Sequence, residues 1–220
     1  MKRSWILLLM AFVLVSLACG KVEQQAAGAG GGGTISGVTS VDEDEDDVID
    51  DVPEAVNGIF TVAELQALID AGLPVFIGAE QPNVEGTYNA GSLRITYDSS
   101  GGSGALPIYM YYFTGQTDAA TVNVAFTDEQ GTDVSTGNLT YIAGSGDCFS
   151  LFGLEEITNS SAECVYQRAT VYSGCISATD GVVGFSFGFY MRELSGTCTN
   201  MLEAGSMRVI KETDNLATRH

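Results

Sequence analysis

The sequence predicts a mainly β fold, an antiparallel β-barrel or sandwich of about eight strands with one short N-terminal α-helix. Apolar and polar residues alternate with period two from about residue 86 to residue 210. Short clusters of glycine, aspartate and asparagine separate the alternating stretches, and such short connections favour antiparallel neighbours. The chain holds 27 glycines and only 17% charged residues, which favours turn-rich β structure over helices.

The first residues of the chain have the pattern of a bacterial lipoprotein signal. Lys2 and Arg3 precede an apolar run over residues 5–15, and Ser16-Leu17-Ala18 leads into Cys19. The segment is too short for a stable transmembrane helix. A plain secretory signal is the alternative, but such a site needs only small residues and leaves the cysteine unexplained. We therefore predict cleavage before Cys19 and lipid attachment to it.

The mature chain is strongly acidic. Residues 1–18 hold two of the nine basic residues and none of the 28 acidic ones, so their removal leaves 202 residues and a net charge of −21. This charge opposes binding to nucleic acid phosphates and electrostatic adhesion to anionic membranes. We expect membrane contact through the lipid on Cys19. Gly20 in place of an aspartate favours the outer membrane as the location in the cell envelope.

Residues 19–56 are predicted to form a flexible tether. The glycine-rich run 28–33 offers few side chains for packing, and residues 42–51 include eight acids that repel one another. The acidic run begins with the spacing of an EF-hand loop, which makes calcium binding the alternative interpretation. Asp47 stands where that motif needs a glycine, and Pro53 stands where it needs a glutamate.

A single domain is expected over residues 57–217, beginning with a short helix. Thr61 is a good N-cap, and Glu64 three residues later completes a capping box. Gly72 can take the left-handed position at the helix end, and Pro74 prevents continuation. Apolar residues share one face of the helix, so we expect it to pack against the β domain or to close one end of it.

Eight runs are expected as strands, with apolar side chains facing inward and polar side chains outward. In one run, Val165, Ala169 and Val171 alternate with Tyr166, Arg168 and Tyr172. A membrane-spanning barrel would need strands of about ten residues with an apolar outer face, which these runs do not show. The expected strands are residues 93–97, 108–113, 122–126, 139–141, 148–154, 165–172, 183–191 and 207–209.

Four cysteines remain once Cys19 carries lipid. An even number in an exported chain predicts two disulfides. Three connectivities exist, and we favour Cys148–Cys164 with Cys175–Cys198 because each pair joins consecutive segments. A zinc site is the alternative, but the spacing contains no C-x-x-C pair.

Catalytic motifs are weak, and we predict no catalytic residue, no cofactor and no metal site. Residues 184–188 match the G-x-S-x-G nucleophile elbow around Ser186. The serine lies within an expected continuous strand, and the general base would have to be His220, the last residue, with Asp214 as its partner.

Paired carboxylates would indicate hydrolysis of envelope carbohydrate. Glu155-Glu156 is the nearest candidate, although adjacent residues in a strand face opposite sides. This hydrolase is one alternative to the favoured hypothesis of a non-enzymatic binding or structural β module. A protein-interaction module with an exposed sheet edge or aromatic patch is the other.

Two sets of aromatic residues are candidates for contacting a small apolar or carbohydrate ligand. One set lies in a predicted strand near the middle of the chain, and the other forms one face of a later strand toward the expected interior. Packing within the core is the alternative interpretation of both. The two sets are Tyr109, Tyr111 and Tyr112, and Phe185, Phe187 and Phe189.

Three short segments are similar to a family of uncharacterised lipoproteins from Gram-negative bacteria. They read GAEQPNVEGTY at residues 78–88, AGSGDCF at residues 143–149 and GSMRVIK at residues 205–211. The chain then reads ETDNLA at residues 212–217, where the family has D-G-D-G-L-A. The resemblance implies a C-terminal β-rich domain, barrel-like or lipocalin-like. It implies no known activity and no site residues.

Overall fold

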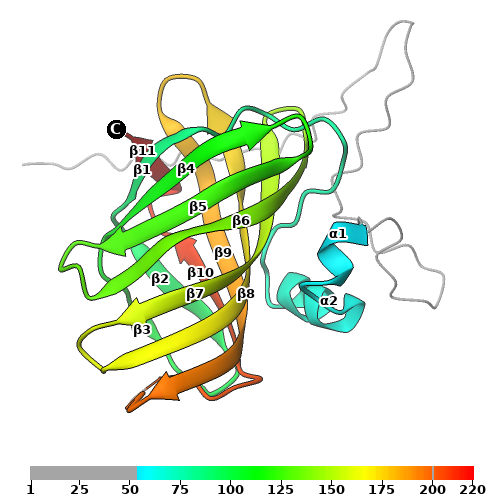
Figure 1. Cartoon of the computed structure of the whole chain (residues 1–220). Helices are drawn as coiled ribbons and strands as arrows, with labels where there is room; N and C mark the ends of the chain where they lie inside the picture. Colours follow the sequence, from blue (N-terminus) through cyan, green and yellow to red (C-terminus); the bar gives the residue numbers. More distant parts are fainter. Residues whose placement is uncertain (1–53, 200) are drawn as a thin grey trace, which may run out of the picture. The chain divides into compact units, whose positions relative to one another are not determined.

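The computed structural model describes residues 54–199 and 201–220. The predicted signal, Cys19 and the acidic run lie outside the described residues. The described part contains the following helices and strands (Figure 1): α1 (Glu54–Asn57), α2 (Val62–Asp70), β1 (Gly86–Ala90), β2 (Leu93–Asp98), β3 (Gly104–Ala105), β4 (Tyr109–Thr117), β5 (Thr121–Asp128), β6 (Asp133–Ser145), β7 (Cys148–Asn159), β8 (Cys164–Ser177), β9 (Gly181–Gly196), β10 (Met207–Glu212) and β11 (Leu216–Arg219).

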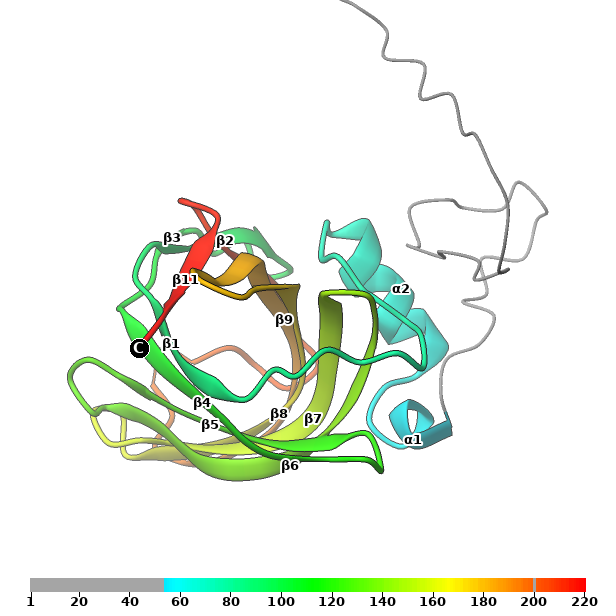
Figure 2. The ribbon, with the colours of Figure 1, turned by 90° about the horizontal axis from the view of Figure 1, so that it is seen from above.

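The strands form one antiparallel sheet in the order β11-β1-β4-β5-β6-β7-β8-β9-β10-β2-β3. β11 pairs with β1 on one side and with the first residues of β9 on the other. The hydrogen-bonded neighbours therefore form a closed circuit, which can be followed from above in Figure 2. β10, β2 and β3 branch from the later part of β9.

The prediction of a mainly antiparallel β fold is confirmed, but the predicted numbers of strands and helices are too low. The additional strands β1, β3 and β11 contain only two to five residues each. Period-two alternation cannot be recognised over such short stretches, and these strands depend on pairing with distant parts of the chain. The additional helix α1 is a single turn that buries Val56.

The predicted capping box starts α2. The Glu64 backbone N–H donates to the Thr61 side chain (3.2 Å), and the Thr61 backbone N–H donates to the Glu64 carboxylate (2.9 Å). Gly72 follows the helix with φ +91°. Both features are local in sequence, which is why they could be predicted.

The helices pack on the outer face of the sheet. Leu68 and Leu73 lie so close to Gly188 of β9 that a β-carbon there would come within 2.9 and 3.0 Å of their methyl groups. Ala and larger residues would therefore push the helical layer away from the strand. This outer cluster consists of Val56, Phe60, Leu65, Leu68, Leu73, Val75, Ala143, Phe152, Ala169, Val171, Met207 and Val209.

A second, larger cluster fills the inner face of the sheet with aromatic side chains. Tyr111 of β4 lies 5.1 Å from Phe185 and 5.5 Å from Tyr172, measured between ring centroids. Phe113 and Phe149 continue this contact network and are fully buried. The interior is therefore built by aromatic packing across β4, β7, β8 and β9.

The orientation expected for β8 is wrong. Tyr166, Arg168 and Tyr172 face the interior, whereas Ala169 and Val171 face outward into the helix-covered cluster. The outer face of β8 is itself buried by the helical layer at Ala169 and Val171, and both side chains are apolar. A strand that is buried on both faces loses the usual rule that polar residues point outward.

The structure confirms two disulfides and corrects their connectivity. The bonds are Cys148–Cys175 and Cys164–Cys198, with Cα–Cα distances of 3.9 and 4.7 Å. Cys148 and Cys164 begin the adjacent antiparallel strands β7 and β8, so they lie at opposite ends of the pair. Cys148 is instead the register partner of Cys175. With all four cysteines bonded to each other, the zinc alternative is also wrong.

Candidate functional site

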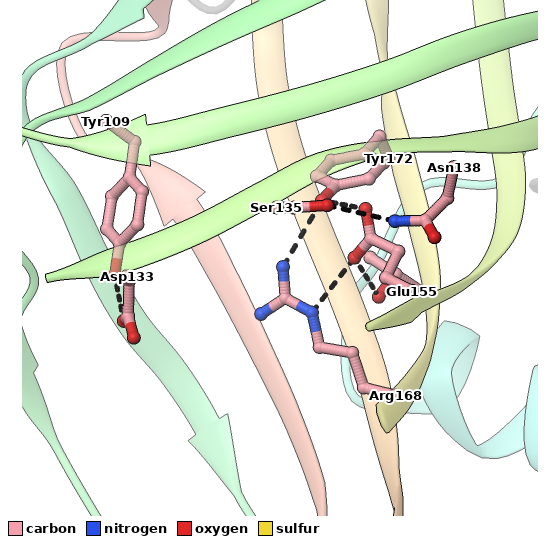
Figure 3. A network of polar contacts seen from close by, with 8 residues as sticks. Tyr109, Asp133, Ser135, Asn138, Glu155, Arg168 and Tyr172 are labelled. Carbon is pink, nitrogen blue, oxygen red and sulfur yellow. Dashed lines mark hydrogen bonds and ion pairs between the residues drawn. The ribbon is translucent and has the colours of Figure 1, made fainter. Parts of the chain in front are cut away.

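A charged network lies inside the sheet, between β7 and β8 (Figure 3). Arg168 donates from Nε to Glu155 (3.0 Å), and the Tyr172 hydroxyl donates to the other oxygen of Glu155 (2.7 Å). Thr170 also donates to Glu155 (2.7 Å), and Arg168 Nη2 donates to the Tyr172 hydroxyl (3.2 Å). Glu155 is fully buried, and each of its carboxylate oxygens accepts a hydrogen bond.

Aromatic rings surround the guanidinium of Arg168. Its central carbon lies 4.8 Å from the ring centre of Phe189, 5.1 Å from that of Phe126 and 5.6 Å from that of Phe187. Burial raises the pKa of Tyr172 well above its ordinary value, and the nearby charge of Glu155 adds to that effect. The phenol therefore stays protonated and donates to Glu155. This arrangement neutralises both charges within the core.

A smaller polar group joins β4 to β6 and β7. The Tyr109 hydroxyl donates to Asp133 (2.9 Å), and Asn159 donates to the other oxygen of the same carboxylate (2.7 Å). Burial, followed by the charge of Asp133, raises the pKa of Tyr109. The carboxylate of Asp133 is thereby held by two partners from different strands.

The structure divides the predicted tyrosine set between two faces of β4. Tyr109 and Tyr111 point inward and are buried, whereas Tyr112 points outward and is 39% exposed. Successive residues of a strand face opposite sides, so Tyr112 cannot share a patch with Tyr109 and Tyr111. The other predicted set is Phe185, Phe187 and Phe189, and all three side chains are buried in the interior.

The residues of the nucleophile-elbow motif are not assembled into a triad within the described part of the chain. Ser186 lies within the continuous strand β9, opposite Ser173, and is buried. The Asp214 carboxylate contacts Ser92 (3.4 Å), and the His220 backbone N–H donates to the Thr87 carbonyl (2.9 Å). A nucleophile elbow requires an exposed serine at a strand-to-helix turn, which this strand does not provide.

Glu155 and Glu156 face opposite sides of β7, as their adjacency predicts. Glu155 is buried in the charged network, and Glu156 is exposed. The two carboxyl groups therefore do not flank a common space.

A depression of about 460 Å³ lies on the outer face of the domain. Three separate parts of the chain form it: residues 57–64, which run from the end of α1 into the first turn of α2, the strands β7 and β8, and the later part of β9. Leu154 of β7 contributes an apolar side chain that is 41% exposed. The lining residues are Asn57, Gly58, Ile59, Phe60, Thr61, Glu64, Leu154, Gln167, Arg192 and Glu193.

A β-bulge in β9 directs Arg192 toward this depression. Gln167 pairs with Glu193 and Arg168 pairs with Met191, so Arg192 is the extra residue between the two register pairs. A bulge re-aims side chains, and such bulges are common beside functional sites.

Arg192 connects the sheet to the start of α2. Its guanidinium pairs with both oxygens of Glu64, with Nη2 at 2.9 Å from Oε2, and it also donates to the Ile59 carbonyl (2.8 Å). The hydrogen bond from Arg192 lowers the pKa of Glu64 to about 2 against the smaller effect of burial. The pair thus fixes one wall of the depression and leaves the Glu193 side chain exposed at its edge.

Sequence reasoning identified Glu64 as a capping residue but missed the depression and Arg192. One signal was present in the sequence. The alternation of β9 breaks after Met191, where Arg192 and Glu193 are two successive charged residues. Such a break indicates a bulge.

No group of three or more histidine, cysteine, aspartate or glutamate side chains in residues 54–199 and 201–220 is arranged to hold a metal ion. None of the helices in this part of the chain is long and apolar enough to cross a membrane. Comparisons with protein families, with curated proteins and with solved structures find no match to this chain.

Proposed function

We propose that this protein is a lipid-anchored protein of the bacterial cell envelope, located at the outer membrane, and that its β domain is a non-enzymatic binding module. The anchor rests on the lipoprotein signal before Cys19, and the location rests on Gly20. The similarity of three segments to Gram-negative lipoproteins agrees with this proposal.

The outer depression is the observation that carries the binding role. Its volume of about 460 Å³ falls in the range of small-molecule sites. Its wall is fixed by the Arg192–Glu64 pair, while the amide of Gln167 and the carboxylate of Glu193 line it as hydrogen-bonding groups. Leu154 adds an exposed apolar surface. Amide and carboxylate groups beside an apolar surface suit an oxygen-rich ligand, and we propose an envelope carbohydrate.

The interior offers less support for a ligand. The aromatic side chains there contact one another, and Glu155 is held by Arg168, Thr170 and Tyr172. The same contacts weigh against the hydrolase alternative, because Glu155 is fully buried behind its partners.

We also infer that the closed circuit β1, β4 to β9 and β11 is an eight-stranded barrel, which agrees with the pairing of β11 on both sides.

Calorimetric titration tests the carbohydrate site with soluble peptidoglycan fragments and, separately, with neutral chito-oligosaccharides. We expect saturable binding that falls at least tenfold in Gln167→Ala and in Leu154→Asp. The control is Asp118→Asn, an exposed change in the turn between β4 and β5. Absence of binding by the wild-type protein, or equal binding by all variants, would contradict the proposal.

The anchor is tested independently of the site. We expect metabolic labelling with a radioactive fatty acid to label the wild-type protein and not Cys19→Ala. We also expect the variant to leave the membrane fraction. Labelling of Cys19→Ala would contradict the lipid attachment.

A protein-interaction role is the second candidate, and one observation favours it. Residues 135–140 of β6 have no ladder partner in β7, and the two most exposed neighbouring leucines, Leu139 at 64% and Leu154 at 41%, belong to these strands. Exposed apolar side chains beside an interrupted ladder are features of docking surfaces. A photo-crosslinker at position 139 in cells should give one protein adduct that is absent with the crosslinker at position 118.

A further inference from the structure

The closed circuit depends on a short strand. β11 pairs with β9 through Leu216, Ala217 and Thr218, and with β1 through only two residues. The neighbouring strands of the circuit pair over longer stretches, as β7 and β8 do over twelve residue pairs. The join formed by β11, which we call the seam, is therefore the part of the circuit with the fewest ladder contacts.

Glu212 is the last residue of β10 and directly precedes the turn that leads into β11. It is 6% exposed, and one of its oxygens accepts a hydrogen bond from the Ser92 backbone N–H (2.5 Å). Its other oxygen, Oε2, is buried without a hydrogen-bond partner among the described residues. An unpartnered buried carboxylate oxygen is costly when the group is ionised and far less so when it carries a proton.

Ser92 joins the turn after β1 to the turn before β11. Its carbonyl accepts from the Thr213 backbone (3.0 Å) and from the Thr213 hydroxyl (2.9 Å), and its own hydroxyl contacts Asp214 (3.4 Å). The Glu212 bond to the Ser92 N–H belongs to the same group of contacts. Displacement of Glu212 would thus loosen the attachment of the seam on the β1 side.

The charged surroundings of Glu212 favour its neutral form. Asp214 lies in the turn that follows Glu212, and burial, with a smaller contribution from the charge of Glu212, raises the pKa of the Tyr111 phenol. The nearest basic residues by register, Lys211 and Arg94, pair with each other on the opposite face of the sheet. Burial, and then the charge of Asp214, raises the pKa of Glu212 to about 7 despite the Ser92 bond.

We propose that a proton on Glu212 holds the seam closed, and that its loss releases β11 from β1 and β9. Ionisation places a second negative charge beside Asp214 in a buried site that holds no compensating cation among the described residues. The charge is relieved when the Glu212 side chain leaves the Ser92 N–H and reaches solvent, which displaces the exposed turn at residues 213–215 and carries β11 with it. The closed circuit is therefore most stable below about pH 4.5, and its opening equilibrium rises as the pH approaches 7 and levels off above it. This inference is independent of the carbohydrate site.

Hydrogen exchange of the β11 amides between pH 6 and pH 8 tests the proposal, after correction for intrinsic exchange and relative to β8. We expect the opening equilibrium in the wild-type protein to rise about tenfold, because the open form keeps an ordinary glutamate and each pH unit between the two pKa values changes the ratio tenfold. Glu212→Gln should remove the rise. Glu156→Gln, an exposed change on β7, should keep it.

A flat wild-type profile, or the same rise in Glu212→Gln, would overturn the proposal. Asp214→Asn provides a second variant if Glu212→Gln does not fold. Removal of the Asp214 charge lowers the pKa of Glu212, so the rise between pH 6 and pH 8 should shrink. An unchanged rise in Asp214→Asn would also overturn it.

Discussion

Two arginine–glutamate pairs occupy opposite environments in this domain. Arg168 and Glu155 lie inside the sheet, with side-chain exposures of 8% and 0%, whereas Arg192 and Glu64 lie on the outer face with 27% and 22%. The inner pair needs hydrogen bonds from Thr170 and Tyr172 to offset the loss of water. The outer pair keeps water and instead caps a helix and positions a wall of the depression. The inner pair therefore neutralises two buried charges in the core, whereas the outer pair attaches the start of α2 to β9.

Removal of one inner partner should have the largest effect on stability. Arg168→Met leaves Glu155 buried without its cation, so we expect the free energy of unfolding in urea to fall by about 3–5 kcal/mol. Arg168→Met combined with Glu155→Leu should recover part of this loss. Glu156→Gln is the matched control and should change stability by no more than about 0.5 kcal/mol. If Arg168→Met lost no more stability than this control, the inner pair would not be the more important of the two for stability.

The Cys148–Cys175 bond holds one end of the strands that carry the inner pair. Replacement of both cysteines by alanine opens a loop with a sequence separation of 27 and should lower stability by about 3 kcal/mol under oxidising conditions. Urea unfolding of the double variant measures this. A double-mutant cycle with Arg168→Met then reports whether strand alignment and the inner pair are coupled. Strict additivity would show that the pair does not depend on this bond.

The outer pair should contribute less. Arg192→Lys keeps the charge but cannot bridge both oxygens of Glu64 and reach the Ile59 carbonyl with the same planar geometry. We expect a loss of about 1 kcal/mol by thermal unfolding. If Arg192→Lys lost as much stability as Arg168→Met, the outer pair would contribute as much to stability as the inner pair, and the expected difference between them would be contradicted.

The smallest effect is the pH dependence of the outer pair. The folded pKa of Glu64 is about 2, below its ordinary value of 4.5, so its contribution is fully present above pH 4.5 and is lost as the pH falls toward 2. The carboxylate is partly exposed, so we expect less than about 1 kcal/mol. The stability difference between wild type and Glu64→Gln, measured by thermal unfolding, should shrink over that range. If the stability difference between wild type and Glu64→Gln stayed constant over that range, the lowered pKa of Glu64 would be contradicted.

The comparison also explains what could be predicted from the sequence. The Thr61–Glu64 capping box depends on residues three apart, and the inward face of Phe185, Phe187 and Phe189 follows from alternation within one strand. Both are local patterns. The outward face of β8 was misassigned because the helices that cover Ala169 and Val171 come from a distant part of the chain.

Features that depend on strand register were not predictable in the same way. The disulfide pairs follow from Cys148 standing opposite Cys175, and β11 exists because β9 and β1 both offer it an edge. The outer depression requires α2, β7 and the bulge at Arg192 to come together. Only the break in alternation after Met191 was a local sign of that site.

The corrected disulfides also change how the domain would respond to a protease. The bonds Cys148–Cys175 and Cys164–Cys198 overlap in sequence, so each peptide bond from residue 148 to residue 198 lies within at least one covalent loop. The consecutive pairing would have left residues 165–174 outside both loops. A single cut within residues 165–174 of β8 therefore releases no fragment, whereas cuts at the exposed hairpin residues Ser161 and Thr179 would leave one covalent unit under either pairing. A molecule cut once anywhere between residues 148 and 198 would stay one covalent unit.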